Sequence, residues 1–318
     1  GQEFNRMLRD AGIIRSECLI TNVFDYQLPG NNVTMLCDKK KDLPSDYTLP
    51  PITTGQYLRP DYLDCLDRLA AELELANPNV IVALGNTALW ALCRVTGIGK
   101  YRGTITRCSL LPKFKVLPTY HPANILRQWD NRVVSLTDLI KAKAQSEYSE
   151  IRRPAREIWL NPAITDLYTF EKQYIDGAAL ISVDLETARN KHGRFITCVG
   201  LAPDSMHAVV VPFVNRSRPD FNYWHSSTEE GEAWRWLRKI LMGPQTKVGQ
   251  NGLYDIQWMI RHGLRIQILN YYEDTMLKHH ALQPEMEKGL SFLGSVYTDE
   301  VAWKLMRPRG FKSAKKEE

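Results

Sequence analysis

Two carboxylates stand two residues apart at the end of an apolar run in the middle of the chain. The run covers residues 178–185 and contains Asp184 near its end, and Glu186 follows it directly. Side chains two apart on a β-strand point to the same face, so both acids would face one way. Like charges this close repel, and a divalent cation is the simplest group that makes the arrangement favourable. A strand end with two solvated acids fits the same pattern.

A third carboxylate follows a second turn further along the chain. Asn251 and Gly252 come after the strand-like residues 247–249 and precede a helical pattern in which Asp255 lies about one turn in. Asn251 is a suitable residue to cap this helix. Asp255 could therefore reach the first two acids from another element, and three acids suit two Mg²⁺ or Mn²⁺ ions. The alternative is a capped helix with a surface aspartate.

Together these segments resemble the first two motifs of the DEDD-type 3′-5′ proofreading exonucleases. Residues 249–251 and 273–277 are also similar to segments of family A DNA polymerases. The resemblance implies an RNase H-like domain with a mixed sheet that hydrolyses DNA 3′ ends with two Mg²⁺ or Mn²⁺ ions. It implies catalytic, metal-binding roles for Asp184, Glu186 and Asp255. The residues that it places near the DNA strand are Asn251, Thr187 and Leu185.

The same family has a last motif, a Tyr or His followed by a fourth acid, that this chain does not show. After Leu290 the nearest string is 297–300, whose spacing does not suit an i to i+4 helical pair. Residues 303–307 resemble the connector that precedes this motif in phage polymerases. We therefore expect a fragment that ends before the last motif, and that by itself binds metal and DNA poorly or turns over slowly.

A histidine marks the first half of the chain. His121 follows the strand-like residues 114–118 and precedes Pro122, which forces an extended backbone, so that the ring can face a cleft. A single histidine at such a place is more often structural. However, the chain also contains residues 20–23, which include Asn22, and residues 79–85. These two segments and His121 occur in the order that one known family shows. Together they resemble the uracil-DNA glycosylase superfamily, and its family 4 in particular.

This second resemblance implies a three-layer α/β/α domain with a central parallel sheet and a pocket for a flipped base. Asn22 would read the uracil edge, and His121 would stabilise negative charge on the departing base. Two departures stand out. The family's glycine-rich first motif should lie just before Gly1, and Tyr26 stands where an iron-sulfur cysteine is expected, with Cys37 not placed to replace it. We expect no iron-sulfur cluster and an inactive glycosylase-like domain.

The elements that must position these residues fall into two α/β domains. The polar stretch 152–156 contains a proline and predicts a boundary, which gives a glycosylase-like domain over 1–150 and an exonuclease domain over 155–318. The strands expected from hydrophobic runs are 18–24, 80–84, 114–118, 178–185, 195–201 and 207–213. The helices expected from apolar periodicity are 2–12, 59–76, 85–97, 133–147, 229–242, 252–262, 273–282 and 289–296.

Composition adds weaker constraints. A net charge of +5 favours, without proving, a polyanionic partner. The basic side chains that could contact phosphates, or belong to a solvated surface, are Lys141, Lys143, Arg152, Arg153 and Arg156. No apolar run is long enough to cross a membrane, and we expect no membrane partner. The cysteines are widely spaced, which favours reduced thiols in a cytoplasm, bacterial or phage-infected. Core packing is the expected role of Trp224, Trp234 and Trp236.

A glycosylase-like domain followed by an exonuclease domain is the order found at the front of some phage family A DNA polymerases. The favoured interpretation is therefore the proofreading region of such a polymerase. Its expected partners are single-stranded DNA 3′ ends, uracil-containing DNA and a polymerase domain in the full-length chain. Two alternatives remain at this point. One is a stand-alone repair protein that combines both folds, with glycosylase activity uncertain, and the other is a non-catalytic DNA-binding module.

Overall fold

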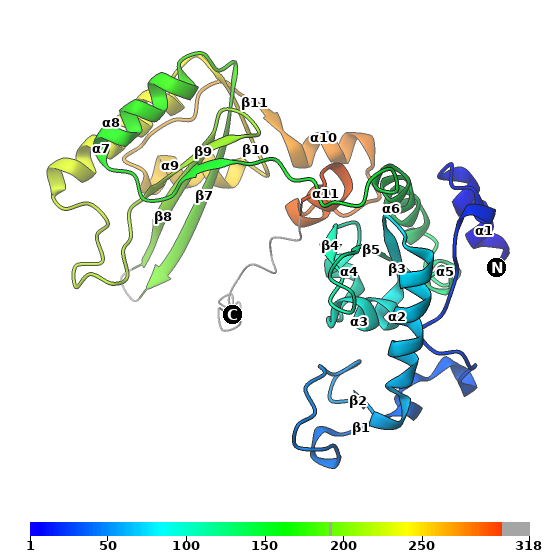
Figure 1. Cartoon of the computed structure of the whole chain (residues 1–318). Helices are drawn as coiled ribbons and strands as arrows, with labels where there is room; N and C mark the ends of the chain where they lie inside the picture. The colour runs from blue at the N-terminus through cyan, green and yellow to red at the C-terminus, as the bar shows by residue number, and fades with distance from the viewer. Residues whose placement is uncertain (191–192, 301–318) are drawn as a thin grey trace. The chain divides into compact units, whose positions relative to one another are not determined.

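The computed structural model describes the backbone of residues 1–190 and 193–300 and divides the chain into two compact units (Figure 1). Within these ranges, the first unit is Gly1–Arg153 together with Ser291–Glu300, and the second is Pro154–Leu290. Among the described residues, no helix is both long and apolar enough to cross a membrane. All of the cysteines lie in this part of the chain, and each is a free thiol.

The first unit is an α/β unit around a short sheet with the strand order β3-β5-β4. Its strands β3 and β5 run parallel, and β4 pairs antiparallel with β5 at the edge. A separate antiparallel pair joins β1 to β2. The strands are β1 (Cys37–Asp38), β2 (Tyr57–Leu58), β3 (Ile81–Leu84), β4 (Thr106–Arg107) and β5 (Lys115–Thr119). The helices are α1 (Gln2–Asp10), α2 (Asp64–Ala76), α3 (Gly85–Cys93), α4 (Ile98–Tyr101), α5 (Pro122–Ile125), α6 (Asn131–Gln145) and α11 (Leu290–Tyr297).

The strand predicted over residues 18–24 is wrong. These residues form no strand, and two of their carbonyl groups are bonded by a side chain rather than by a neighbouring strand. The guanidinium of Arg68, on α2, donates to the backbone oxygens of Asn22 (2.8 Å) and Val23 (3.0 Å). An extended apolar segment can thus satisfy its backbone without joining a sheet.

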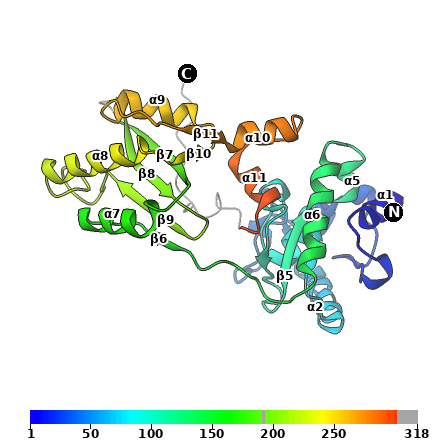
Figure 2. The ribbon, with the colours of Figure 1, turned by 90° about the horizontal axis from the view of Figure 1, so that it is seen from above.

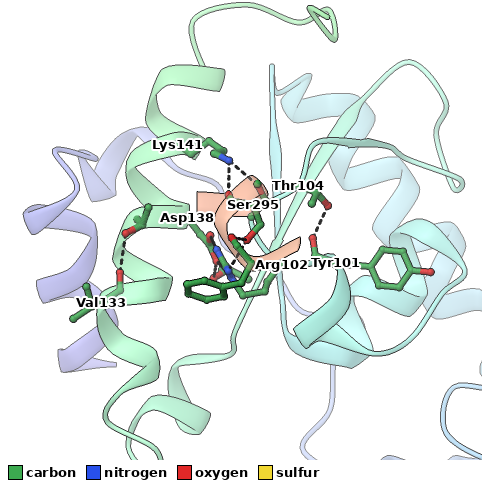
Figure 3. A network of polar contacts seen from close by, with 12 residues as sticks. Tyr101, Arg102, Thr104, Val133, Asp138, Lys141 and Ser295 are labelled. Atoms are coloured by element: carbon green, nitrogen blue, oxygen red, sulfur yellow. Dashed lines mark hydrogen bonds and ion pairs between the residues drawn. The ribbon is translucent and has the colours of Figure 1, made fainter. Parts of the chain in front are cut away.

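Helix α11 packs on the first unit through a buried polar network (Figure 3). Arg102 forms an ion pair with Asp138 of α6, with its Nε 2.9 Å from the carboxylate, and also donates to the hydroxyl of Ser295 at 2.9 Å. Lys141 donates to the backbone oxygens of Ser295 (2.6 Å) and Gly103 (2.8 Å). The Lys141 ammonium is therefore occupied within the fold, which argues against the phosphate contact considered above.

The second unit is built on a mixed sheet, six-stranded in the described residues, with the order β11-β10-β7-β8-β9-β6. The expected meander is confirmed, since β7, β8 and β9 pair antiparallel in sequence order. The remaining neighbours pair in parallel. The strands are β6 (Glu157–Trp159), β7 (Leu180–Asn190), β8 (Gly193–Ala202), β9 (His207–Pro212), β10 (Thr246–Gly249) and β11 (Tyr271–Asp274). Strands β6 and β11 were not anticipated from the sequence.

Helices cover this sheet, and α7 and α8 lie side by side (Figure 2). The helices are α7 (Ile164–Phe170), α8 (Ser227–Leu241), α9 (Leu253–His262) and α10 (Thr275–Leu282). Trp224, Trp234 and Trp236 are all buried in the core, and the ring of Trp234 stacks on Phe213 with centroids 3.9 Å apart. The prediction that these tryptophans serve packing rather than base stacking is confirmed.

Candidate functional site

Strand β7 presents the first two acids as its alternation predicts. Val183 and Leu185 point into the core, whereas Asp184 and Glu186 lie on the exposed face of the strand. Both acids are fixed in a long antiparallel pairing, with Asp184 opposite Gly200 and Glu186 opposite Cys198 on β8. The central position of β7 in the sheet gives these carboxylates a rigid base.

The third acid reaches β7 from another element. Asp255 lies in the first turn of α9, and only 5% of its surface is exposed. The backbone N–H of Leu185, between the two acids of β7, donates to Oδ1 of Asp255 at 3.1 Å. The three predicted acids thus come from two elements that a direct hydrogen bond joins.

The charge of Glu186 acts on Asp184, and the charge of Asp184 acts on Asp255. Burial and the charge of Asp184 raise the pKa of Asp255 to about 7. Loss of water and the charge of Glu186 raise the pKa of Asp184 as well. Acids that disfavour their own ionisation in this way are stabilised by a cation, and carboxylate oxygens suit Mg²⁺ or Mn²⁺. The donor set therefore fits a hard divalent ion.

The three acids are not closed into a metal-binding cluster. Within residues 1–190 and 193–300, no group of three or more His, Cys, Asp or Glu side chains is gathered closely enough to hold a metal ion. The hydrogen bond from Leu185 joins Asp255 to β7, and Asp255 is within electrostatic reach of Asp184, as Asp184 is of Glu186. Convergence of all three around shared ions stays a prediction.

The two further residues predicted on β7 differ in their surroundings. The hydroxyl of Thr187 is 2.8 Å from the hydroxyl of Tyr254, the residue before Asp255, so it lies beside the acids. The side chain of Leu185, by contrast, is only 6% exposed and packs in the core. A substrate contact through that side chain is not compatible with its burial, because alternation turns it away from the acids. Its backbone N–H serves the site instead.

Asn251 does not cap α9 as predicted. The residue at the N-cap position is Gly252, which has no side chain, and Asn251 adopts a left-handed backbone conformation with φ of 58°. The turn is held instead by Asp274, at the end of β11, whose carboxylate accepts from the N–H groups of Asn251 (3.1 Å) and Gly252 (2.9 Å). Sequence reasoning missed Asp274 because its partners lie more than 20 residues away.

In the string 297–300, the described residues belong to the first unit. Asp299 lies 3.9 Å from the ammonium of Lys141, within the first unit. Residues 303–307, which resemble the connector before the last exonuclease motif, lie outside the described residues.

A second candidate site is a cavity of about 1620 Å³ in the first unit. Asn22 and His121, predicted from distant segments, both line it. The parallel strands β3 and β5 end at the same edge, where Gly85 follows β3 and His121 follows β5. A Cβ atom on Gly85 would lie 3.0 Å from Cβ of His121, so glycine lets the two segments approach.

The ring of His121 is held in one tautomer. Its Nδ1 accepts a hydrogen bond from the backbone N–H of Ala123 at 3.1 Å, which caps α5. In the neutral ring the proton is then on Nε2. Burial, followed by the charge of Arg127, lowers the pKa of His121 below its usual value. A neutral imidazole that donates through Nε2 is therefore favoured at pH 7.

Other residues around this cavity add detail to the sequence prediction. Tyr26, where the resemblance calls for a cysteine, lines the cavity. Cys37 donates its thiol to the backbone oxygen of Val33 at 3.3 Å, and burial raises its pKa. Leu126 and Trp129 also line the cavity with largely exposed side chains, and sequence reasoning missed both.

Comparison with known families decides what these two units are. Residues 1–147 match the family described as uracil DNA glycosylase superfamily, and residues 163–306 match the family described as 3′-5′ exonuclease. The chain joins a domain of each family. The glycosylase-superfamily domain includes Asn22 and His121, and the exonuclease domain includes Asp184, Glu186 and Asp255.

Two curated proteins are similar to the chain. The DNA polymerase of Bacillus phage SP01 is 24% identical over 255 residues, which cover 72% of this chain and 27% of that protein. The type-4 uracil-DNA glycosylase of Thermotoga maritima is 32% identical over 148 residues, which cover 45% of this chain and 64% of that protein. The chain thus spans about a quarter of the polymerase and just under two thirds of the glycosylase.

Two solved structures illustrate the similarity of the chain to known folds. Brucella melitensis NrnC with bound Mg²⁺ is 16% identical, covers 47% of this chain and 64% of its own length, and has a TM-score of 0.32. The Aedes aegypti Nibbler EXO domain is 11% identical, covers 46% of this chain and 72% of its own length, and has a TM-score of 0.35.

Proposed function

We propose that the exonuclease domain removes nucleotides from DNA 3′ ends with divalent cations bound by Asp184, Glu186 and Asp255. One observation carries the proposal. The hydrogen bond from Leu185 to Asp255 joins the strand that carries Asp184 and Glu186 to the helix that carries Asp255, inside a segment that matches the 3′-5′ exonuclease family. Mg²⁺ or Mn²⁺ would supply a nucleophilic water and charge stabilisation for phosphodiester hydrolysis.

The residues of the chain would position the ions and the terminal nucleotide, and their carboxylates would neutralise charge. Asp184 and Asp255 would hold the ions against the rigid sheet, and Glu186 would add a third carboxylate oxygen donor from the same strand. Thr187 and Tyr254 form an exposed pair of hydroxyls beside them, suitable for contacts to the terminal nucleotide. Asn251, on its left-handed turn, is exposed and would lie near the DNA strand.

The proposal is tested with a 5′-labelled single-stranded oligonucleotide and an excess of the chain in Mn²⁺. The expected result is a ladder of products that shorten by one nucleotide, abolished by Asp184→Ala and by Asp255→Ala. Asp220→Ala is a matched control, since Asp220 lies in an exposed loop of the same unit, where it pairs with Arg218 and accepts from the backbone N–H of Asn222. Degradation that persists in Asp184→Ala, or that Asp220→Ala removes equally, would contradict the assignment.

We further propose that the natural protein is a phage-type family A DNA polymerase in which this chain precedes the polymerase domain. The similarity to the Bacillus phage SP01 polymerase supports it, since that match extends over both domains of the chain. Single-stranded 3′ ends would then be the substrate of a proofreading site. Primer extension by the natural full-length protein, with misincorporation raised by Asp184→Ala, is the expected result. A stand-alone repair protein would show trimming without extension.

A second candidate function belongs to the glycosylase-superfamily domain. Asn22 and His121 line one cavity, and the tautomer of His121 leaves an N–H free to donate to a base oxygen. We propose that this cavity recognises uracil in DNA. Single-stranded DNA with one uracil should bind more tightly than the same DNA with thymine, and Asn22→Ala should remove the difference. Equal affinity for the two DNAs would mean that the domain binds DNA without recognising uracil.

A further inference from the structure

One carboxylate in the exonuclease domain serves two helices. Asp274 is the N-cap residue of α10 and accepts from the N–H groups of Met276 (2.9 Å) and Leu277 (3.3 Å). The same carboxylate accepts from Asn251 (3.1 Å) and Gly252 (2.9 Å), which form the turn before α9. Helix N-termini carry partial positive charge, so two of them directed at one carboxylate form a strong electrostatic junction.

The turn before α9 depends on this junction because it has no cap of its own. Gly252 offers no side chain, and Asn251 has a positive φ of 58°, which is unfavourable for most residues. The hydroxyl of Tyr271 donates to Asp274 at 3.2 Å and fills the space beside the turn. A Cβ atom on Gly252 would lie only 1.9 Å from that hydroxyl, so the turn fits closely against β11.

The direction of α9 follows from where the turn is held. Asp255 is three residues after Gly252, in the first helical turn, and its carboxylate must reach the N–H of Leu185 on β7. A shift of the turn would move Asp255 with it, since the two are joined by a rigid helical segment. Burial alone would raise the pKa of Asp274, but its backbone hydrogen bonds outweigh this and hold the pKa below its usual value. The junction therefore remains charged at neutral pH.

We infer that Asp274 is a positioning residue of the exonuclease site, which fixes the start of α9 so that Asp255 meets the metal-binding edge of β7. The inference rests on the proposed exonuclease function. Asp274 itself touches no predicted ligand. It acts through the turn Asn251–Gly252, in the way that groups behind metal ligands set ligand orientation.

A helix cap elsewhere in the same unit provides a matched control. Asp166 accepts from the backbone N–H of Ala163 at 2.8 Å at the start of α7, and α7 carries none of the predicted metal ligands. Asp274→Asn and Asp166→Asn both replace a capping carboxylate by a neutral amide. A purely structural role predicts a loss of thermal stability from each variant, larger at Asp274 because it accepts more hydrogen bonds than Asp166, and no effect on the reaction from either.

The experiment compares both variants with the wild-type chain in two readouts, Mn²⁺ affinity by calorimetry and single-turnover degradation of single-stranded DNA. Asp274→Asn should weaken Mn²⁺ binding and slow degradation, each by about 10-fold to 100-fold, whereas Asp166→Asn should change neither. Asp274→Glu, which keeps the charge, should recover part of the loss. If Asp274→Asn fails to fold, Tyr271→Phe should still weaken Mn²⁺ binding, by about threefold, since it removes one hydrogen bond of the junction.

The inference is overturned if Asp274→Asn retains wild-type Mn²⁺ affinity and rate, whatever its loss of thermal stability. Unchanged Mn²⁺ affinity in Tyr271→Phe would also overturn the inference. Failure of the exonuclease assignment has another signature. In that case Asp184→Ala itself would leave Mn²⁺ affinity and degradation unchanged.

Discussion

The carboxylate of Asp255 accepts a hydrogen bond from the backbone N–H of Leu185, 3.1 Å away. This bond joins helix α9 to the strand that carries Asp184 and Glu186, and it orients one oxygen of Asp255 toward the sheet. Ionisation of a buried acid in this position lowers the free energy of unfolding when no cation is bound. The site can therefore be tested by stability measurements, without any substrate.

When no metal is present, the stability of the chain should decrease as the pH rises. The pKa of Asp255 is about 7 in the fold, whereas an aspartate in the unfolded chain ionises near pH 4. The unfolded state therefore loses its proton first, and the free energy of unfolding decreases between about pH 4 and pH 7. The free energy of unfolding of Asp255→Asn, measured relative to that of the wild-type chain, should therefore be about 1 to 3 kcal/mol higher at pH 8 than at pH 4.5.

Urea denaturation in EDTA at the two pH values measures this difference. Asn keeps an oxygen that can accept from Leu185, so the variant isolates the charge. Mn²⁺ at pH 8 should restore the stability of the wild-type chain and not that of Asp255→Asn. A pH profile that is identical for both proteins would show that Asp255 ionises normally.

A glycine in the first unit should depend on the packing of α11. Gly103 has φ of 71°, and a Cβ atom there would lie 2.7 Å from Asp138 and 2.9 Å from the backbone oxygen of Ser295. Gly12 has the same φ with open space around it. Gly12→Ala should cost about 1 kcal/mol from backbone strain alone. Gly103→Ala should cost clearly more, and equal losses in thermal unfolding would mean that α11 does not pack there.

The buried ion pair of Arg102 and Asp138 should be sensitive to removal of one partner. Asp138 also accepts from Thr119 at 2.7 Å, so Asp138→Ala leaves two buried donors without their acceptor. Loss of about 3 to 5 kcal/mol is expected, because the Arg102 charge would remain buried. Ser295→Ala, which leaves the ion pair intact, should cost about 1 kcal/mol. Chemical denaturation of both variants gives the comparison, and the reverse ranking would contradict this account.

His121 should be neutral, with its proton on Nε2, at pH 7. The N–H of Ala123 occupies Nδ1, and burial lowers the pKa of the ring. Nitrogen-15 NMR of labelled histidine reports both the tautomer and the pKa. A pKa below that of a free histidine and an Nε2–H signal are expected. Stability should correspondingly decrease as the pH falls below about 6.5, since the unfolded ring takes up its proton first.

The sequence was sufficient for features that depend on local pattern. The period-two alternation of β7 predicted that Asp184 and Glu186 share a face opposite Leu185. The same pattern predicted the β7-β8-β9 meander, because hydrophobic runs separated by short turns pair with their neighbours. The tryptophan core followed from helical periodicity at Trp234.

The features that were missed depend on partners far away in the chain. Asp274 looks like an ordinary helix cap, and only the fold brings the turn at Asn251 to its carboxylate. The short strand β11 gains its pairing from β10, and its own four residues carry little pattern. The apolar pattern of residues 18–24 predicts a strand, yet Arg68 bonds the carbonyl groups of Asn22 and Val23.

The central claim is that Asp184, Glu186 and Asp255 bind the same divalent cations. Anomalous X-ray scattering from crystals of the chain soaked in Mn²⁺ tests it most directly. The account predicts anomalous peaks within coordination distance of the carboxylates of Asp184 and Asp255, lost in Asp184→Ala. Peaks only at other positions, or peaks that persist unchanged in Asp184→Ala, would contradict it.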